Sequence, residues 1–212
     1  VNISVQANTI APIIAAPAPF ICSGDSSIIA VQAGGTYCAS AAQYTADEEI
    51  FNVTLGSLNN TSDCFTLAGG PGSILQRYSN FTSGAGAPAV PNLAAGSTAA
   101  GSVTVGTCGN FNYTSGLAVF IDFNQDGDFT DIGEKVYSNG AVANLNCLPA
   151  TVVPISIAVP ATALNGSTRM RVVNQESIAG NAINPCTIQS WGETEDYLIN
   201  ITGGASYNYT WT

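Results

Sequence analysis

The chain has 212 residues, which is enough for one large β domain or for one domain with flanking pieces. Its formal net charge is −10 with only four cationic side chains, which cannot neutralise a phosphate backbone, so we expect neither nucleic acid nor an anionic membrane surface as a partner. The most apolar stretch, residues 9–22, contains three prolines and is shorter than the ~20 residues that a membrane-spanning helix needs, so we expect no membrane insertion.

Short runs of alternating apolar and polar residues, bounded by Gly, Asn and Pro, recur along the chain. This period of two predicts β-strands rather than helices. In chain order we predict strands at 1–6, 50–55, 101–106, 117–123, 152–159, 168–173 and 196–202, with an exposed loop of small residues at 83–102. We therefore expect an all-β chain folded as a jelly-roll-like β-sandwich.

The two ends of the chain predict a division into domains. Residues 1–20 have the pattern of the last strand of a preceding module, followed by a Pro-rich linker. Segments 21–35 and 203–212 resemble two strands of the immunoglobulin-like repeats of bacterial surface adhesins. We therefore expect residues 36–202 to form a second domain, inserted into an exposed loop of a split immunoglobulin-like module within a longer polypeptide. The alternative is that both ends add strands to one sandwich.

The cysteines predict disulfides and an oxidising, extracellular setting. They form no C-x-x-C pair and the chain contains no histidine, so zinc and haem sites lose their usual ligands. We expect Cys38 to pair with Cys186 and Cys108 with Cys147, leaving Cys22 and Cys64 unassigned.

One acidic segment has the spacing of a calcium-binding loop. In DFNQDGDFTDIGE, residues 122–134, Asp122, Asn124 and Asp126 alternate and are followed by Gly127 and Asp128, which is the D-x-N-x-D-G pattern. Oxygens at these alternate positions converge on one point as the backbone curls, and Ca²⁺ takes six to eight such ligands. The alternative is an Asx turn that needs no ion. We predict Ca²⁺, because so many carboxylates repel one another without a cation.

The flanking residues make this loop a β-hairpin rather than an EF-hand. Strand-like sequences precede and follow it, and position 12 is Gly133 rather than a glutamate. Asp131, Glu134 or a carboxylate from elsewhere in the chain must therefore complete the shell. We expect a structural role for the ion, since no base or nucleophile accompanies the loop.

Several ordered blocks of the chain resemble the GEVED domain of secreted bacterial proteins of the Bacteroidota type. They are VFIDFNQDGDFTDIGEKVYS (119–138), STRMRVVNQ (167–175) and SWGETEDYLINI (190–201), in which Thr194 replaces the valine of the G-E-V-E-D motif. Upstream, the residues around 37–64 and 77–83 resemble the opening of that domain. The resemblance implies an extracellular β-sandwich in multidomain surface proteins, often exported by the type IX pathway, and no known enzymatic activity.

The resemblance also directs attention to a second acidic segment. On a strand, Glu193 and Glu195 share one face, while Thr194 and Asp196 share the other. These acids either complete the calcium shell or pair with Arg169 and Arg171, and both alternatives remain open. The candidate ligands of the ion are Asp122, Asn124, Asp126, Asp128, Glu134 and Glu195, followed by Asp131, Glu193 and Asp196.

These features predict a non-enzymatic, calcium-stabilised module of a long extracellular bacterial adhesin or filament. Its partners would be neighbouring modules, copies of the same chain in a fibre, and surface glycans. The alternative is a calcium-dependent carbohydrate-binding module attached to a secreted enzyme. Trp191, Tyr197 and Trp211 would then form a sugar-binding platform, although buried aromatic residues are the commoner use of such side chains in a sandwich.

Overall fold

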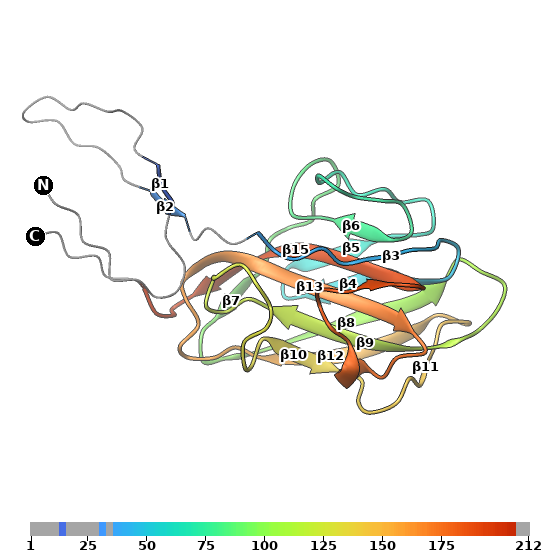
Figure 1. Cartoon of the computed structure of the whole chain (residues 1–212). Helices are drawn as coiled ribbons and strands as arrows, with labels where there is room; N and C mark the ends of the chain where they lie inside the picture. The colour runs from blue at the N-terminus through green and yellow to red at the C-terminus, as the bar shows by residue number, and fades with distance from the viewer. Residues whose placement is uncertain (1–12, 16–29, 33–35, 207–212) are drawn as a thin grey trace, which may run out of the picture.

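The computed structural model describes residues 13–15, 30–32 and 36–206, and almost all of its regular structure is β-strand (Figure 1). The strands are β1 (Ile13–Ala15), β2 (Ala30–Gln32), β3 (Ala41–Ala42), β4 (Glu48–Leu55), β5 (Leu58–Thr61), β6 (Tyr78–Asn80), β7 (Asn92–Ala94), β8 (Thr98–Thr107), β9 (Thr114–Ile121), β10 (Lys135–Ser138), β11 (Leu145–Asn146), β12 (Thr151–Ala158), β13 (Gly166–Glu176), β14 (Ile188–Gln189) and β15 (Gly192–Thr202). A short 3₁₀ turn, Gly180–Ala182, follows β13.

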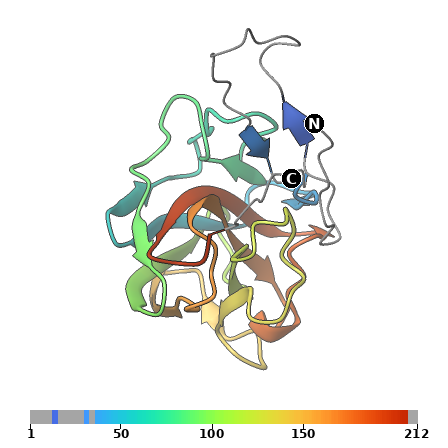
Figure 2. The ribbon, with the colours of Figure 1, turned by 90° about the vertical axis from the view of Figure 1, so that its left-hand side faces the viewer.

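Two sheets form a sandwich. The larger has the order β10–β9–β13–β15–β6, with β11 also paired to β9 and β7 to β15, and the smaller has the order β12–β8–β4–β5. Figure 2, turned by 90° from Figure 1, looks roughly along these strands. The fold class predicted from the alternating pattern, an all-β sandwich, is confirmed.

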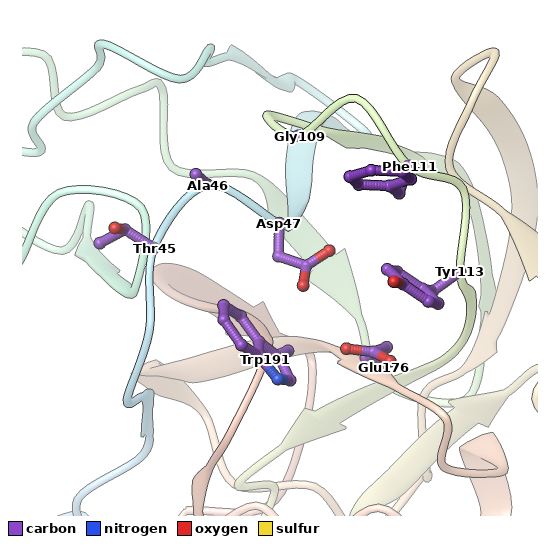
Figure 3. Close-up of a pocket in the computed structure, with 8 residues that line it drawn as sticks. All are labelled: Thr45, Ala46, Asp47, Gly109, Phe111, Tyr113, Glu176 and Trp191. Atoms are coloured by element: carbon purple, nitrogen blue, oxygen red, sulfur yellow. The ribbon is translucent and has the colours of Figure 1, made fainter.

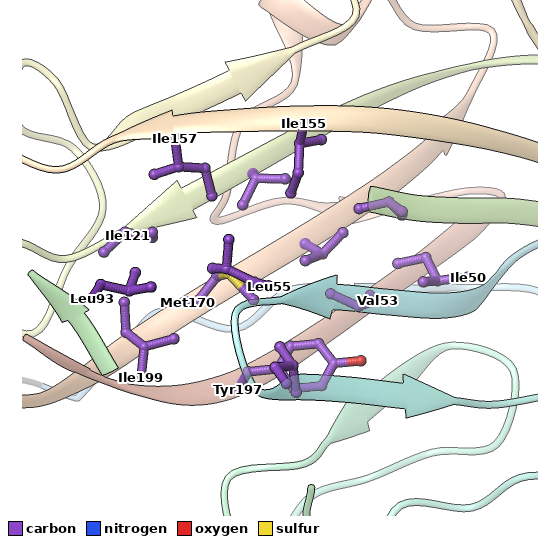
Figure 4. Packing of buried hydrophobic residues seen from close by; sticks show 14 of the residues in the cluster. Ile50, Val53, Leu55, Leu93, Ile121, Ile155, Ile157, Met170, Tyr197 and Ile199 are labelled. Carbon is purple, nitrogen blue, oxygen red and sulfur yellow. The ribbon is translucent and has the colours of Figure 1, made fainter. Parts of the chain in front are cut away.

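The core lies between the two sheets. Ile50, Val53 and Leu55 of β4 face Met170 of β13 and Ile199 of β15, and all five side chains are buried (Figure 4). In β12 every second residue faces this layer, which is the reason for the alternation in the sequence. In β4 a bulge between Ile50 and Asn52 shifts the alternation, so that Ile50 and Val53 are both buried.

A second, smaller apolar cluster covers the outer face of the larger sheet. Phe120 and Val173 of the sheet are covered by Phe129, which belongs to the loop after β9, and by Ile183. The ring of Tyr37 packs on Phe129 with their centroids 4.9 Å apart. The loop that contains the acidic motif is therefore packed onto the sheet rather than projecting from it.

The predicted strands agree with the observed ones at six places, each within a few residues of its bounds: β4, β8, β9, β12, β13 and β15. The prediction of an exposed loop over 83–102 is wrong in its second half. β7 pairs with β15 there and buries Leu93, and β8 begins at Thr98. These strands could not be predicted from composition alone, because small residues are typical of loops as well as of close-packed strand edges.

The predicted flanking segments fall mainly outside the described residues. These are the strand at 1–6, most of segments 1–20 and 21–35, and residues 207–212, which include Trp211. Within the described part, β1 pairs with β2 in antiparallel register. No helix among the described residues is long and apolar enough to cross a bilayer.

Two disulfides link distant parts of the chain. Cys38–Cys186 is present as predicted, but Cys108 bonds to Cys64 rather than to Cys147. Cys108 follows β8, beside the segment that leads out of β5 and carries Cys64. Cys147 instead follows β11, where it is buried as a free thiol 3.4 Å from the hydroxyl of Ser115.

Candidate metal centre

The acidic loop connects β9 to β10 at one end of the larger sheet. The N–H of Ile121 donates to the carbonyl of Glu134 at 2.8 Å, which closes the base of the loop, and the N–H of Asp122 donates to the carbonyl of Arg169 on β13. Gly127 has a φ of +90°, a left-handed conformation that favours glycine and produces the sharp turn expected at this position of the motif.

The carboxylate of Asp122 lies at the centre of the loop. It is fully buried and accepts hydrogen bonds from the N–H groups of Asp126 and Gly127 at 3.2 and 3.0 Å. The hydroxyl of Tyr37 donates to the same carboxylate at 2.6 Å. Asp122 thereby joins the loop to the segment that covers the outer face of the sheet.

Asn124 bridges two further carboxylates of the loop. Its amide nitrogen donates to Asp126 at 3.0 Å and to Asp131 at 2.5 Å, while its amide oxygen accepts the N–H of Asp126. The carboxylate of Glu134 accepts the N–H groups of Phe123 and Asp131. The structure therefore brings together five of the predicted ligands, namely Asp122, Asn124, Asp126, Asp131 and Glu134.

Asp128 occupies a different position in the same loop. Its carboxylate accepts the N–H and the hydroxyl of Thr130 at 2.7 and 2.8 Å, as in an Asx turn. These bonds direct the side chain of Asp128 toward the next turn. We therefore expect Asp128 to bind an ion through its backbone carbonyl, as residue 7 of a calcium-binding loop does.

The loop concentrates negative charge in a partly dry environment. Burial raises the pKa of Asp122 and of Asp126 above the usual range of an aspartate, and neighbouring carboxylates add to both shifts. Burial, reinforced by the charges of Asp122 and Asp126, raises the pKa of Glu134 to about 7. A cation among these groups would favour their ionised forms and remove the repulsion.

The distal acids of the G-E-T-E-D string do not reach the loop. β13 lies between β9 and β15, so Glu193, Glu195 and Asp196 are two strands away from the segment that leads into it. Asp196 instead forms a buried ion pair with Arg171 at 2.7 Å and a second pair with Arg169 at 3.3 Å. The ion-pair alternative is therefore the one that the structure adopts, with Asp196 rather than a glutamate as the acid.

Glu193 and Glu195 point into the sandwich, on the face opposite to Asp196. Glu193 accepts the N–H of Ile50 at 3.0 Å and the hydroxyl of Ser79 at 2.7 Å, and Glu195 accepts the hydroxyl of Tyr197 at 2.7 Å. Burial raises the pKa of both glutamates, and the charge of Glu193 raises that of Glu195 further. These two acids belong to the polar part of the core and not to the loop.

Their buried carboxyls predict that the apo protein loses stability as the pH rises. An unfolded glutamate titrates near 4.3, whereas the folded pKa of Glu193 and Glu195 is raised. The folded state then holds more protons than the unfolded state above about pH 4.3, so the free energy of unfolding falls with rising pH. Urea denaturation in EDTA between acidic and mildly alkaline pH is expected to show this slope.

The variant Glu195→Gln is expected to have a shallower slope, because it keeps the shape of the side chain and removes one titrating group. Asp63→Asn is the matched control, since Asp63 is exposed and its hydrogen bonds to Thr66 and Phe65 lower its pKa. An equal slope in Glu195→Gln and the unmodified chain would contradict the assignment.

A third group of carboxylates was not predicted. Asp47, Glu48 and Glu176 place one ligand atom each within 4.8 Å of one another, and within the described part of the chain this is the one group of three acids that meets this distance. No three carboxylates of the loop meet it. The three consecutive acids Asp47–Glu49, just before the predicted strand, could have indicated an acidic site. The third member of the cluster, Glu176, could not be assigned to it, because it comes from a remote part of the sequence.

These acids adjoin a pocket of about 510 Å³ at the other end of the sandwich (Figure 3). Its lining includes Trp191, one of the predicted platform residues, together with Phe111 and Tyr113. Tyr197 is not part of a platform, because it is fully buried and stacks on Phe81.

Comparison with known proteins gives a family match for part of the chain. Among solved structures, the CARDB domain of a Pyrococcus furiosus protein, solved in complex with di-metal ions, is similar over 80% of this chain and 96% of that chain, at 8% sequence identity and a TM-score of 0.33. None of the curated proteins matches the chain. The family model described as the GEVED domain matches residues 116–200, the part that extends from β9 to β15 and contains both the acidic loop and the G-E-T-E-D string.

Proposed function

We propose that this chain is a non-enzymatic, calcium-stabilised structural and adhesive module of a long extracellular bacterial surface protein. The observation that carries the proposal is the loop after β9, in which Asp122, Asn124, Asp126, Asp131 and Glu134 converge. All of them offer hard oxygen ligands, which suit Ca²⁺. Its partners in this function are neighbouring modules or copies of the chain in a fibre.

The position of the loop explains how an ion would stabilise the module. Asp122 holds the hydroxyl of Tyr37, and Phe129 of the loop packs on Tyr37 and on Phe120 of the sheet. An ion bound by Asp122 and Asp126 would therefore fix the loop and, through these rings, the segment that covers the outer face of the larger sheet.

The disulfides support an extracellular location, because such bonds persist in oxidising compartments. Attachment to the cell surface, export by the type IX pathway and a source among Bacteroidota-type bacteria follow from the family resemblance, and we include them in the proposal.

Thermal unfolding with and without calcium tests the role of the ion. At a concentration a hundredfold above Kd, Ca²⁺ is expected to stabilise the chain by about 2.7 kcal/mol. For a domain of this size that corresponds to a rise in Tm of about 5–11 °C over the value in EDTA. Asp126→Asn is expected to lose most of the rise that is due to the loop, because it removes one charged ligand and preserves the shape of the side chain.

Asp63→Asn serves as the control, since it removes an exposed acid far from the loop in sequence. An equal Tm in calcium and EDTA, or the same rise in Asp126→Asn as in the unmodified chain, would show that the loop is an ion-free turn.

A second candidate function, calcium-dependent carbohydrate binding, is favoured by the pocket in Figure 3. Three aromatic side chains line it and remain open to solvent, with exposed fractions of 71% for Phe111, 48% for Tyr113 and 36% for Trp191. Such rings stack on the apolar faces of sugars. Saturable, calcium-dependent binding to one sugar class on a glycan array, abolished in Trp191→Ala, would favour this function over a purely structural one.

A further inference from the structure

The carboxylates beside the pocket come from two strand ends. Asp47 precedes β4, Glu48 is the first residue of β4, and Glu176 is the last residue of β13. Their ligand atoms lie within 4.8 Å of one another. Asp47 and Glu176 line the pocket, whereas Glu48 is buried beneath it.

Glu48 provides a second and independent observation. Its side chain is only 1% exposed, and neither of its carboxylate oxygens has a hydrogen-bond partner. A buried carboxylate without a partner is costly, and proteins normally offset this cost by pairing the group or by coordinating a metal with it.

A second unpartnered polar group lies in the same region. Asn174 is fully buried, and neither its amide oxygen nor its amide nitrogen has a hydrogen-bond partner. This end of the sandwich thus contains buried polar side chains without hydrogen-bond partners, next to the pocket that Asp47 and Glu176 line.

We propose that Asp47, Glu48 and Glu176 bind a Ca²⁺ ion at the floor of this pocket, as a second cation site separate from the acidic loop. Two oxygens on opposite sides of a Ca²⁺ ion lie about 4.6–5.2 Å apart, twice the usual ligand distance, so the observed spacing accommodates this ion with little rearrangement. Mg²⁺ needs a tighter shell of about 2.1 Å, and the all-oxygen ligand set offers no soft donor for zinc.

The geometry leaves one side of the ion open. Figure 3 shows the carboxylate of Asp47 pointing into the space between Trp191 and Tyr113, with Glu176 nearby. The remaining coordination positions of the ion therefore face the pocket, where water or the hydroxyl oxygens of a ligand held between the rings can fill them. A polyhydroxylated ligand suits this site, because its hydroxyl groups can fill the free coordination positions of the ion while its apolar faces stack on the aromatic walls of the pocket.

The surrounding backbone holds the site in place. The N–H of Cys108 donates to the carbonyl of Asp47 at 2.9 Å, and Cys108 is itself fixed by its disulfide to Cys64. The N–H of Glu176 donates to the carbonyl of Trp191 at 3.3 Å, which ties a ligand of the ion to a wall of the pocket. Two of the three acids are thus anchored through their own backbone, so little ordering is needed when the ion binds.

The site is independent of the acidic loop. On β9, Ser115 pairs with Glu176 at the pocket end, whereas Ile121 leads into the loop at the other end. The strand between them spans roughly 20 Å at its usual rise per residue, so each site can be removed without disturbing the other.

Calcium titration of the whole chain by calorimetry, combined with terbium luminescence, tests the proposal. Terbium replaces Ca²⁺ at oxygen sites and emits when a nearby tryptophan is excited, at a wavelength that tyrosine does not absorb. Glu176→Gln is expected to bind Ca²⁺ at the pocket site at least about 10–100-fold more weakly and to lose the tryptophan-sensitised emission. Trp191→Phe is expected to lose the emission and to retain the calcium stoichiometry.

Asp126→Asn is the matched control, because it changes the loop and leaves the pocket intact. We expect it to keep the tryptophan-sensitised emission and to lose the other calcium ion. Retention of both the emission and the full stoichiometry in Glu176→Gln would overturn the pocket site. Loss of binding in Glu176→Gln with none in Asp126→Asn would support the pocket site while contradicting the loop site. Circular dichroism of each variant is the check that it is folded.

Discussion

Replacing Asp196 by alanine is expected to lower the free energy of unfolding by about 3–5 kcal/mol, which is the cost of leaving a buried guanidinium without its carboxylate. Asp196 accepts two hydrogen bonds from Arg171, from Nε at 2.7 Å and from Nη2 at 2.8 Å, and both residues are buried. Small domains have a total stability of about 5–15 kcal/mol, so urea denaturation is expected to show a large fall in the midpoint.

The double variant Arg171→Met with Asp196→Leu separates loss of the pair from loss of packing. It is expected to recover most of the stability, because apolar residues of similar volume often replace a buried ion pair at little cost. The carbonyls of Cys38 and Pro185 would lose the donor that Arg171 Nη1 provides, so recovery should be incomplete.

Arg169→Met is the matched control for this prediction. The side chain of Arg169 is 23% exposed and reaches the same carboxylate at 3.3 Å, so its loss should cost no more than about 1 kcal/mol. A cost below about 1 kcal/mol for Asp196→Ala would contradict the account of the pair as a buried and compensated charge.

Removing the Cys38–Cys186 disulfide in the variant Cys38→Ala with Cys186→Ala is expected to be the second large effect. The bond closes a loop with a sequence separation of 148 residues. In the chain-entropy description a loop of this length stabilises the folded state by about 5 kcal/mol, at the upper end of the measured range. The midpoint of urea denaturation is expected to fall accordingly.

The second disulfide provides the comparison. Cys64–Cys108 closes a loop with a sequence separation of 44 residues, for which the same relation gives about 4 kcal/mol. Arg171 donates to the carbonyls of Cys38 and Pro185, so breaking the first disulfide also loosens the partners of a buried charge. A smaller loss for Cys38–Cys186 than for Cys64–Cys108 would contradict this order.

The strands of the sandwich were predictable where one face is buried. In β12 the alternation of buried and exposed residues is nearly complete, and Ile155 and Ile157 point inward while Ser156 does not. β7 escaped prediction because its single buried residue, Leu93, stands among alanine, glycine and proline. Its existence depends on pairing with β15 and not on a pattern of its own.

The acidic loop was predictable because all of its information is local. Asp122, Asn124 and Asp126 lie within five residues, and Gly127 determines how the backbone turns. The partners of Glu193, Glu195 and Asp196 were not predictable in the same way. The alternation of residues along the strand predicted which of these acids share a face. It could not predict that Asp196 forms an ion pair with Arg171 or that Glu193 accepts a hydrogen bond from the N–H of Ile50.

The sequence by itself determined the class of fold and the D-x-N-x-D-G turn, because period-two alternation and turn chemistry act between neighbouring residues. Its cysteines also predicted that the chain contains disulfides. Only the tertiary structure decided which acids meet. Asp47 and Glu48 lie close to Glu176 because β4 pairs with β8, β13 pairs with β9, and the two sheets stack on each other. Cys108 forms its disulfide with Cys64 rather than with Cys147 for the same reason. Contacts between residues so far apart in the chain depend on strand order and register, which no short stretch of sequence contains.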